Sequence, residues 1–407
     1  MVNVIGLGYI GLPTALMLAA HGVEVVGTDY NKEVVEELNN GTPTFKENGL
    51  KELFDAATAK GIKFTKEYQQ TDTYIISVPT PYDKVSKKVD ACYVVAAVKS
   101  VLETCKKGST IIIESTISPG TIDRQIRPLI SMYGFKAGLD IHLAHAPERI
   151  IPGNMIYELI HNNRTIGADN SNTAKRVKTL YSSFCEGEIV TTDIRTAEMT
   201  KVVENTFRAV NIALANELSR ICHYNGMDVH EIIRICNMHP RVNIMSPGPG
   251  VGGHCIPIDP WFLVGDYPQL AKMIGASLEV NKSQPDFVLQ RIAETMHKTG
   301  IKDNSRVGLY GMTYKENVDD FRESPTLQIM ESQRQHLATP LKCYDPLLEN
   351  KKIAETQYTD FDEFLASVDL VVIMVKHDHI KQNWDKLKGK TILDCHNICP
   401  LPGTFKL

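Results

Sequence analysis

The chain has 407 residues, a formal net charge of −4 and a sequence pI near 6.4. This length predicts two or three domains, and the slight negative charge argues against a general nucleic-acid binder. No apolar run is long enough to cross a bilayer. The nine cysteines form no CxxC pair, so we expect no metal site and a protein of the reducing cytoplasm.

The first part of the chain alternates predicted strands and helices. Apolar runs at Val2–Ile5 and Val23–Thr28 flank a helix from Leu12 to His21. Further buried strands are predicted at Tyr74–Val78, Thr110–Glu114 and His142–Ala146. This alternation is typical of a doubly wound parallel sheet.

The turn after the first strand carries a GxGxxG sequence formed by Gly6, Gly8 and Gly11. These glycines permit a tight turn, a close approach to a pyrophosphate and close helix packing. The amides of Tyr9 and Ile10 begin the helix, where they can bind an anion. Asp29, after the next strand, would accept hydrogen bonds from a ribose diol and repel a 2′-phosphate. The sequence therefore predicts an NAD site rather than a glycine turn used only for packing.

From about residue 196 the pattern becomes helical. Residues 196–236 contain no proline and one glycine, which predicts a long helix followed by a shorter one. The stretch from Pro268 to about Gly300 is also predicted to be helical. Lys201, Asn205 and Arg208 share one face of the long helix. Because their neighbours are apolar, this face is expected to be buried, where an anionic ligand explains the cations better than a solvated surface does.

Between these helical segments lies a glycine-rich loop with one cysteine. Four glycines occur in the six residues before His254-Cys255, and Asp259 follows four residues later. Such a backbone can approach a ligand closely, and a nearby cation or helix terminus would help the thiol to ionise. The other eight cysteines are more typical of small buried hydrophobes. We therefore predict that Cys255 is a nucleophile.

The last part of the chain alternates again. Strands are predicted at Arg306–Tyr310, Leu341–Tyr344, Leu370–Val375 and Thr391–Asp394. The run Val307–Gly311, followed later by Asp345, repeats the first turn and its acid in a degraded form, which predicts a second nucleotide-type domain. Lys315 and Arg322 flank a charged loop that would meet phosphates.

Several motifs occur in a diagnostic order along the chain. They are Gly6–Pro13, Val78–Pro81, Glu114–Thr116, Pro147–Arg149, Lys201 with Asn205, Gly252–Cys255 and Arg322–Pro325. On these motifs the chain resembles the UDP-glucose/GDP-mannose dehydrogenase family over nearly its whole length. Pro147–Arg149, His239–Asn243 and Asp259–Phe262 resemble the branch acting on UDP-N-acetyl-D-mannosamine. Ile256–Ile258 also resembles the branch acting on UDP-N-acetylglucosamine.

The resemblance implies a fold and an assembly. Two Rossmann-like domains are joined by a helical central region, with expected boundaries at 1–190 (NAD), 191–300 (cysteine loop and dimer contacts) and 301–407 (UDP). Subunits pair through the central region as a homodimer or higher homo-oligomer. In this arrangement Arg241 can act across the interface.

The resemblance also assigns roles to residues. Catalytic roles fall to Cys255, Lys201, Asp259, Asn205 and Glu148. The NAD site is expected to include Thr80, Thr116 and Arg322 in addition to the glycine turn and Asp29. The UDP-sugar would be held by Arg149, Ile150, Lys201, Asn205, Arg208, His239, Arg241, Gly252, Tyr314 and Lys315.

The expected activity is a four-electron, NAD-dependent oxidation of UDP-N-acetyl-D-mannosamine at carbon-6, through a thiohemiacetal and a thioester on Cys255. UDP-N-acetylglucosamine and UDP-glucose are the alternative substrates, and Asp259 and Glu148 are both candidates for the hydrolytic base. Two other classes compete. A two-electron hydroxyacid dehydrogenase needs no cysteine, and a non-catalytic nucleotide-sugar binder needs neither Cys255 nor Lys201. The number of NADH formed per sugar distinguishes all three.

Overall fold

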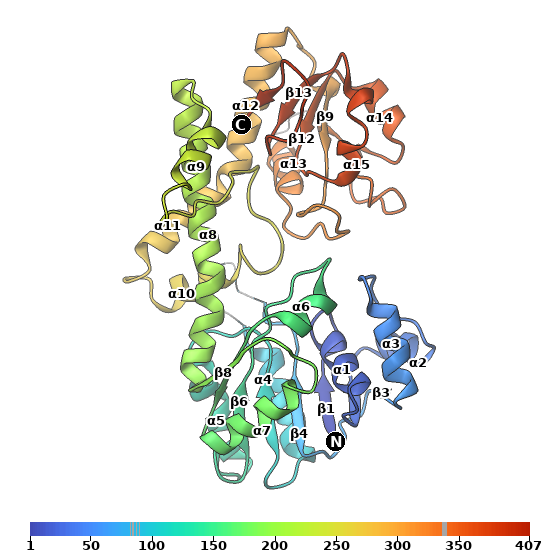
Figure 1. The fold of residues 1–407 in the computed structure, drawn as a ribbon, viewed down its shortest axis with the longest axis vertical. Coiled ribbons are helices and arrows are strands. Elements are labelled where there is room, and N and C mark those ends of the chain that lie inside the picture. Colours follow the sequence, from blue (N-terminus) through green and yellow to red (C-terminus); the bar gives the residue numbers. More distant parts are fainter. Residues whose placement is uncertain (82, 84, 87, 89, 336–339) are drawn as a thin grey trace. The chain divides into compact units, whose positions relative to one another are not determined.

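The structure is a computed structural model that describes residues 1–81, 83, 85, 86, 88, 90–335 and 340–407. Its contacts divide the chain into two compact units, Met1–Glu204 and Asn205–Leu407 (Figure 1). Each unit contains a sheet of parallel or mostly parallel strands with helices packed on it. The predicted class, two Rossmann-like domains with a helical central region, is confirmed. The division at 1–190, 191–300 and 301–407 stays a prediction.

The first unit is built on an eight-stranded sheet in the order β3-β2-β1-β4-β5-β6-β7-β8. Its strands are β1 (Val2–Ile5), β2 (Val25–Thr28), β3 (Lys63–Thr65), β4 (Thr73–Ile76), β5 (Thr110–Ile113), β6 (His142–His145), β7 (Arg164–Ala168) and β8 (Ile189–Thr192). The first six are parallel in the 3-2-1-4-5-6 order of dinucleotide-binding folds. Strand β7 runs antiparallel to β6, and β8 is parallel to β7.

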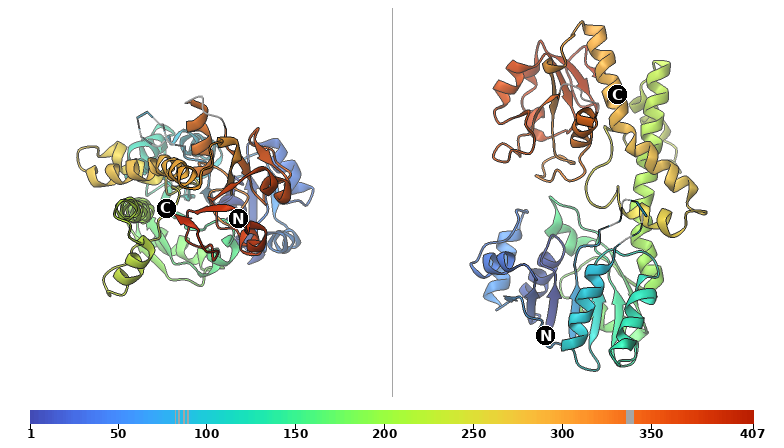
Figure 2. Two further views of the ribbon diagram at one scale, coloured as in Figure 1. Left: turned by 90° about the horizontal axis from the view of Figure 1, so that it is seen from above. Right: turned by 180° about the vertical axis from the view of Figure 1, so that it is seen from behind.

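Helices cover both faces of this sheet. Figure 1 shows α1, α6 and α7 in front, and the reverse view in Figure 2 brings α4 forward. One hydrophobic core joins α1, α3 and α7 to the sheet, and a second joins α4 and α5 to its other face. The helices are α1 (Gly11–Ala20), α2 (Lys32–Asn39), α3 (Leu50–Ala59), α4 (Cys92–Thr104), α5 (Arg127–Met132), α6 (Met155–His161) and α7 (Ser171–Tyr181), with a π-helical turn at Ile122–Ile126.

The helical region begins with α8 (Ile194–Asn225), which crosses the boundary between the units. Helix α9 (Val229–Cys236) follows, and Asp228 caps it by accepting the amides of His230 and Glu231. The predicted long helix and shorter helix are therefore confirmed, and the break falls at Gly226, which has a φ of +68°. The remaining helices here are α10 (Asp259–Asp266), α11 (Lys272–Lys282) and α12 (Gln284–Thr299).

The second unit also contains a six-stranded parallel sheet in the order β11-β10-β9-β12-β13-β14. The strands are β9 (Val307–Tyr310), β10 (Lys342–Tyr344), β11 (Gln357–Tyr358), β12 (Leu370–Ile373), β13 (Thr391–Asp394) and β14 (Phe405–Lys406). Helices α13 (Pro325–Gln335), α14 (Phe361–Ser367) and α15 (Asp378–Lys381) follow β9, β11 and β12. Counted along its own strands, this order is again 3-2-1-4-5-6, as predicted for a second nucleotide-type domain.

Candidate active site

The glycine-rich turn of the first unit has the geometry of a dinucleotide loop. Gly6 has a φ of +88°, and a Cβ there would lie 2.5 Å from the backbone oxygen of Ser77. At Gly11 a Cβ would lie 1.8 Å from the oxygen of Gly6, so both positions exclude a side chain. By contrast, a Cβ at Gly8 would meet nothing within 4 Å, which leaves room for a pyrophosphate against the backbone.

The amino end of α1 is suited to an anion. Within this fully described helix, no side chain caps the first turn and no acid lies in it. The positive end of the helix dipole, at Ile10 and the first turn, thus favours a phosphate there. The geometry therefore fits the cofactor phosphates at the predicted place.

Asp29 links this turn to the next strand. Its Oδ2 accepts the amide of Leu7 at 2.8 Å, and its Oδ1 accepts the amide of Asn31 at 2.9 Å. The residue is half-buried, and each carboxylate oxygen can accept a second hydrogen bond. Asp29 can therefore hold the loop and still accept from the hydroxyls of a ribose.

Thr80 and Thr116 lie beyond the carboxyl ends of β4 and β5. Both are half-buried. Because β1, β2, β4 and β5 are parallel, these threonines follow the same edge of the sheet as the glycine turn and Asp29. The predicted NAD residues of the first unit are therefore gathered at one sheet edge, whereas Arg322 lies in the second unit.

In the second unit, the cysteine loop leads directly into α10. The carbonyl of Cys255 accepts the amides of Ile258 at 3.0 Å and Asp259 at 2.8 Å, which starts the helix. Asp259 is buried, and its Oδ2 accepts the side-chain amide of Asn205 at 2.6 Å. The exposed Cys255, the buried acid and the α8 amide thus belong to one connected group.

The glycines before Cys255 are required by close packing within the second unit. A Cβ at Gly252 would lie 2.7 Å from the oxygen of Glu323 and from Cβ of Tyr314. Gly253 has a φ of +88°, and a Cβ there would lie 2.9 Å from the Tyr314 ring. The amide of Gly253 also donates to the carbonyl of Arg322 at 3.0 Å. The cysteine loop therefore lies against both segments in which phosphate-binding residues were predicted.

Arg322 and Lys315 are placed differently around this contact. The Arg322 guanidinium makes a two-atom contact with the carboxylate of Asp320, its Nη2 lying 2.6 Å from Oδ2. Lys315 is half-buried, and its carbonyl accepts the hydroxyl of Thr313. This hydrogen bond lies within the loop that follows β9 and carries Tyr314 and Lys315.

Three other predicted anion-binding groups form no ion pair with a described acid. Among the described residues, the side chains of Lys201, Arg208 and Arg241 make no ion pair, although Lys201 is only 8% exposed. His239 is exposed, and its Nδ1 accepts the amide of Arg241. A buried ammonium without a counter-ion is costly, which favours an anionic ligand at Lys201.

Glu148 lies in a buried charge network inside the first unit. One of its oxygens pairs with Nη2 of Arg164, and the other accepts the amide of Arg149 at 2.7 Å. Arg164 also lies 3.8 Å from Glu114, and its guanidinium stacks on the ring of Tyr181. Burial raises the pKa of Glu114 to about 7, against the opposing effect of Arg164.

The sequence patterns indicate Glu114 only as part of the motif Glu114–Thr116, and they do not indicate Arg164 or Glu204. Glu114 also accepts the hydroxyls of Thr14 on α1, Ser77 and Tyr181. No local spacing relates these residues, since they come together only when the sheet forms. The one available signal was Glu114 at the end of a predicted buried strand, where a carboxylate needs a partner.

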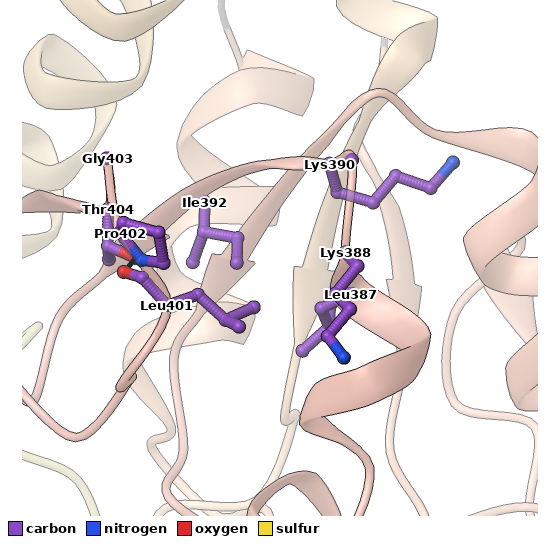
Figure 3. Close-up of a pocket in the computed structure, with 9 residues that line it drawn as sticks. Leu387, Lys388, Lys390, Ile392, Leu401, Pro402, Gly403 and Thr404 are labelled. Carbon is purple, nitrogen blue, oxygen red and sulfur yellow. Dashed lines mark hydrogen bonds between the residues drawn. The ribbon is translucent and has the colours of Figure 1, made fainter.

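A cavity of about 160 Å³ at the amino end of β13 is not part of this site. Figure 3 shows its lining, in which the apolar side chains are Leu387, Ile392, Leu401 and Pro402. Its two lysines are engaged elsewhere. Lys388 pairs with Asp385, and Lys390 donates to the carbonyl of Val368. In a nucleotide-type fold, ligands bind at the carboxyl ends of the strands, so we assign no function here.

Neither a metal site nor a membrane-spanning helix is found among residues 1–81, 83, 85, 86, 88, 90–335 and 340–407. Among those residues, no group of three or more histidine, cysteine or acidic side chains is arranged to hold a metal ion. None of the described helices combines the length and the apolar character needed to cross a membrane.

The chain matches three domains of the UDP-glucose/GDP-mannose dehydrogenase family. The NAD binding domain matches residues 1–185, the central domain residues 195–283 and the UDP binding domain residues 308–400. These matches include the glycine turn of the first unit and the cysteine loop of the second.

Individual relatives support the same family. The chain is 42% identical over 407 residues to the UDP-N-acetyl-D-mannosamine dehydrogenase of Methanococcus maripaludis, covering 97% of this chain and 92% of the relative. It is 37% identical to the NDP-N-acetyl-D-galactosaminuronic acid dehydrogenase of Ralstonia nicotianae, with coverage of 98% and 96%. The structure of the UDP-N-acetyl-mannosamine dehydrogenase of Staphylococcus aureus is similar at a TM-score of 0.88 and 39% identity, covering 100% of this chain and 97% of that one.

Proposed function

Because the chain belongs to the UDP-glucose/GDP-mannose dehydrogenase family and is an NAD-dependent UDP-sugar dehydrogenase, we propose that it oxidises carbon-6 of UDP-N-acetyl-D-mannosamine. The product is the corresponding uronate. The net reaction converts one primary alcohol, one water and two NAD⁺ into one carboxylate, two NADH and three protons. The choice of sugar is supported by the relatives with this name and by the motifs around Glu148 and Asp259.

The hydrogen bond from Asn205 to Asp259 is the observation that carries the mechanism. At 2.6 Å it connects α8 to the first residue of α10, whose amide is bonded to Cys255. This group combines a nucleophile, an acid and an amide donor, which a simple alcohol dehydrogenase does not need. A covalent route through the thiol explains why all three are held together.

Each group has a proposed role. Lys201 and Asp259 would hold the water that removes the proton of the substrate alcohol. NAD⁺ supplies the oxidising equivalents when bound at the glycine turn. Cys255 would add to the aldehyde as a thiohemiacetal, and a second oxidation leaves a thioester. Asp259 or Glu148 would activate the water that hydrolyses it. The Lys201 ammonium and the Asn205 amide would stabilise the tetrahedral oxyanions.

Two cations of the second unit are proposed to bind the diphosphate. Arg208 and Lys315 in the second unit are suited to its oxygens, because arginine and lysine are the usual phosphate ligands. Tyr314 and Gly252 lie in contact, so they would line the same part of the sugar site. His239, Arg241 and Ile150 remain candidates from the family resemblance.

One incubation tests the reaction and a second tests the sugar. Two NADH per UDP-N-acetyl-D-mannosamine consumed would support the proposal, whereas one NADH would indicate a two-electron dehydrogenase and none a binding protein. Specificity constants for UDP-N-acetylmannosamine, UDP-N-acetylglucosamine, UDP-glucose and GDP-mannose would then rank the substrates. A higher constant for UDP-N-acetylglucosamine would reject the proposed epimer, since a site that hydrogen-bonds the N-acetyl group should discriminate strongly.

We also propose that the enzyme pairs with a second copy through the central region. Phe207, Leu214, Ile221 and Tyr224 lie on one face of α8 and are 57%, 48%, 48% and 90% exposed. Monomers rarely leave such a stripe in water. Leu214→Glu should therefore shift the mass measured by light scattering from dimer to monomer. A wild-type mass equal to one chain would contradict the assembly.

The nine cysteines are all thiols, and each lies among the described residues. This chemistry fits a reducing compartment, which supports a cytoplasmic location for the proposed reaction.

A further inference from the structure

The side chain of Arg149 is fully engaged inside its own unit. Its Nε and Nη2 contact the two oxygens of Glu204 at 2.9 and 2.6 Å. Its Nη1 donates to the carbonyl of Asn163 at 2.8 Å, and Nη2 also donates to the hydroxyl of Thr165 at 2.9 Å. The guanidinium is therefore a clamp between the segment around β7 and helix α8. Its charge is already balanced by a carboxylate, unlike the charges of Arg208 and Arg241.

Glu204 lies beside Lys201 on the same helix. Residues three apart on a helix are neighbours, so Glu198 and Glu204 flank Lys201 one turn before and one turn after it. Each acid is bound to another partner. Glu198 accepts the amides of Gly120 at 2.5 Å and Ile122 at 3.0 Å, and Glu204 is bound by Arg149. Lys201 thus keeps an ammonium without an ion pair although acids adjoin it on both sides.

We propose that Arg149 is a positioning residue that binds Glu204 and so keeps this acid away from the Lys201 ammonium. The inference rests on the function proposed above, in which Lys201 stabilises the oxyanions. In this arrangement the Arg149 side chain does not bind the diphosphate, and any contact of this segment with substrate comes from its backbone. Glu198 is held in the equivalent way by the two backbone amides.

The balance of interactions supports this role. If Arg149 turned to the substrate, Glu204 would lose its two-atom ion pair and become available to Lys201 at i−3. Opposite charges at this spacing attract, so the freed acid would pair with the ammonium that the reaction needs. A bidentate arginine pair holds a carboxylate in a fixed direction, whereas a lysine could not.

A double-variant cycle tests this proposal. Arg149→Gln, Glu204→Gln and the variant with both changes are compared with wild type for kcat and for the KM of the UDP-sugar. Arg149→Gln should lower kcat by roughly tenfold or more with little change in KM, because the freed acid quenches an interaction made in the transition state. The double variant should return to within about threefold of Glu204→Gln, because the quenching acid is gone.

A control variant and a replacement variant accompany this test. Arg195→Gln removes an exposed arginine ion pair with Asp123 near the start of the same helix and should leave kcat unchanged. If the Arg149→Gln variant does not fold, Arg149→Lys is measured instead. Arg149→Lys should lower kcat by a smaller factor, and adding Glu204→Gln should again reverse this loss. The proposal would be overturned if Arg149→Gln raised the KM of the UDP-sugar and the double variant had the same low kcat and the same raised KM. Arg149 would then be a direct ligand of the substrate. Failure of the proposed function is separate, since wild type would then form no uronate.

Discussion

Glu114 should make the first unit less stable as the pH rises from about 4.5 to about 7, and Glu114→Gln should remove this dependence. The carboxyl is fully buried, and burial raises its pKa from an ordinary 4.5 to about 7. Below pH 4.5 the group is protonated in both the folded and the unfolded chain, so it contributes nothing. Between pH 4.5 and 7 the folded chain keeps a proton that the unfolded chain has lost, so the free energy of unfolding falls.

The magnitude follows from the difference between the two pKa values. A difference of about 2.5 corresponds to about 3 kcal/mol, which is reached above pH 7 and stays constant there. Glutamine stays neutral at every pH. Its oxygen can take the place of Oε1 and accept the hydroxyls of Thr14 and Tyr181, and its amide nitrogen can donate to the hydroxyl oxygen of Ser77. The stability of Glu114→Gln relative to wild type should therefore increase by about 2.5 kcal/mol between pH 5 and pH 8.

The assay must report on the first unit alone. Both tryptophans, Trp261 and Trp384, lie in the second unit, so their fluorescence would follow the wrong part of the chain. Native-state hydrogen exchange of the β5 amides, corrected for intrinsic exchange at each pH, gives the opening free energy of the first unit. Exchange of the β12 amides serves as the internal control. A relative stability that stays flat from pH 5 to pH 8 would refute the assignment.

Three further substitutions test the proposed roles. Cys255→Ser should reduce uronate formation by several orders of magnitude, because an alkoxide-derived ester is hard to form and hydrolyse here. The rate is measured as NADH released per minute at saturating substrate, and full turnover would exclude the covalent route. Asp29→Ala should raise the KM for NAD by about 10- to 100-fold with little change for the UDP-sugar, and an unchanged NAD titration would show that the ribose contact is wrong. Lys201→Ala should lower kcat by about 100- to 1,000-fold with a smaller effect on UDP-sugar binding measured by calorimetry; weaker binding at normal kcat would make Lys201 an anchor instead.

Most of the fold could be predicted because strong local patterns carry it. Every strand predicted in the two sheets was found, since each is a short apolar run between turn residues. The strands that were missed lack this signal. Strand β3 is three residues long, β11 and β14 are two residues long, β8 exposes Val190, and β7 begins with the buried Arg164. The antiparallel pairing of β7 could not be predicted, because it depends on how a polar strand meets β6 after the parallel sheet has formed.

The site was predictable wherever one motif holds its residues together. The glycine turn with Asp29 and the cysteine loop with Asp259 are local, so spacing and residue type indicate their chemistry. The network of Glu114, Arg164 and Glu148 is not, since its members come from β7 and the ends of two other strands. The engagement of Arg149 by Glu204 likewise spans 55 positions. A cation in a sequence motif looks the same whether it binds a phosphate or a buried acid.

The two sheets show how far sequence position determines a role. Asp29 and Asp345 each follow the second strand of a 3-2-1-4-5-6 sheet, and each accepts amides from the glycine turn after the first strand. Asp29 is half-buried with acceptor capacity remaining. Asp345 is fully buried and accepts the amides of Met312, Thr313 and Leu347 as well as Nε2 of His377. A ribose diol could not displace these four donors without exposing them, so the second sheet keeps the architecture of a dinucleotide fold while its acid serves to hold the loop that carries Tyr314 and Lys315.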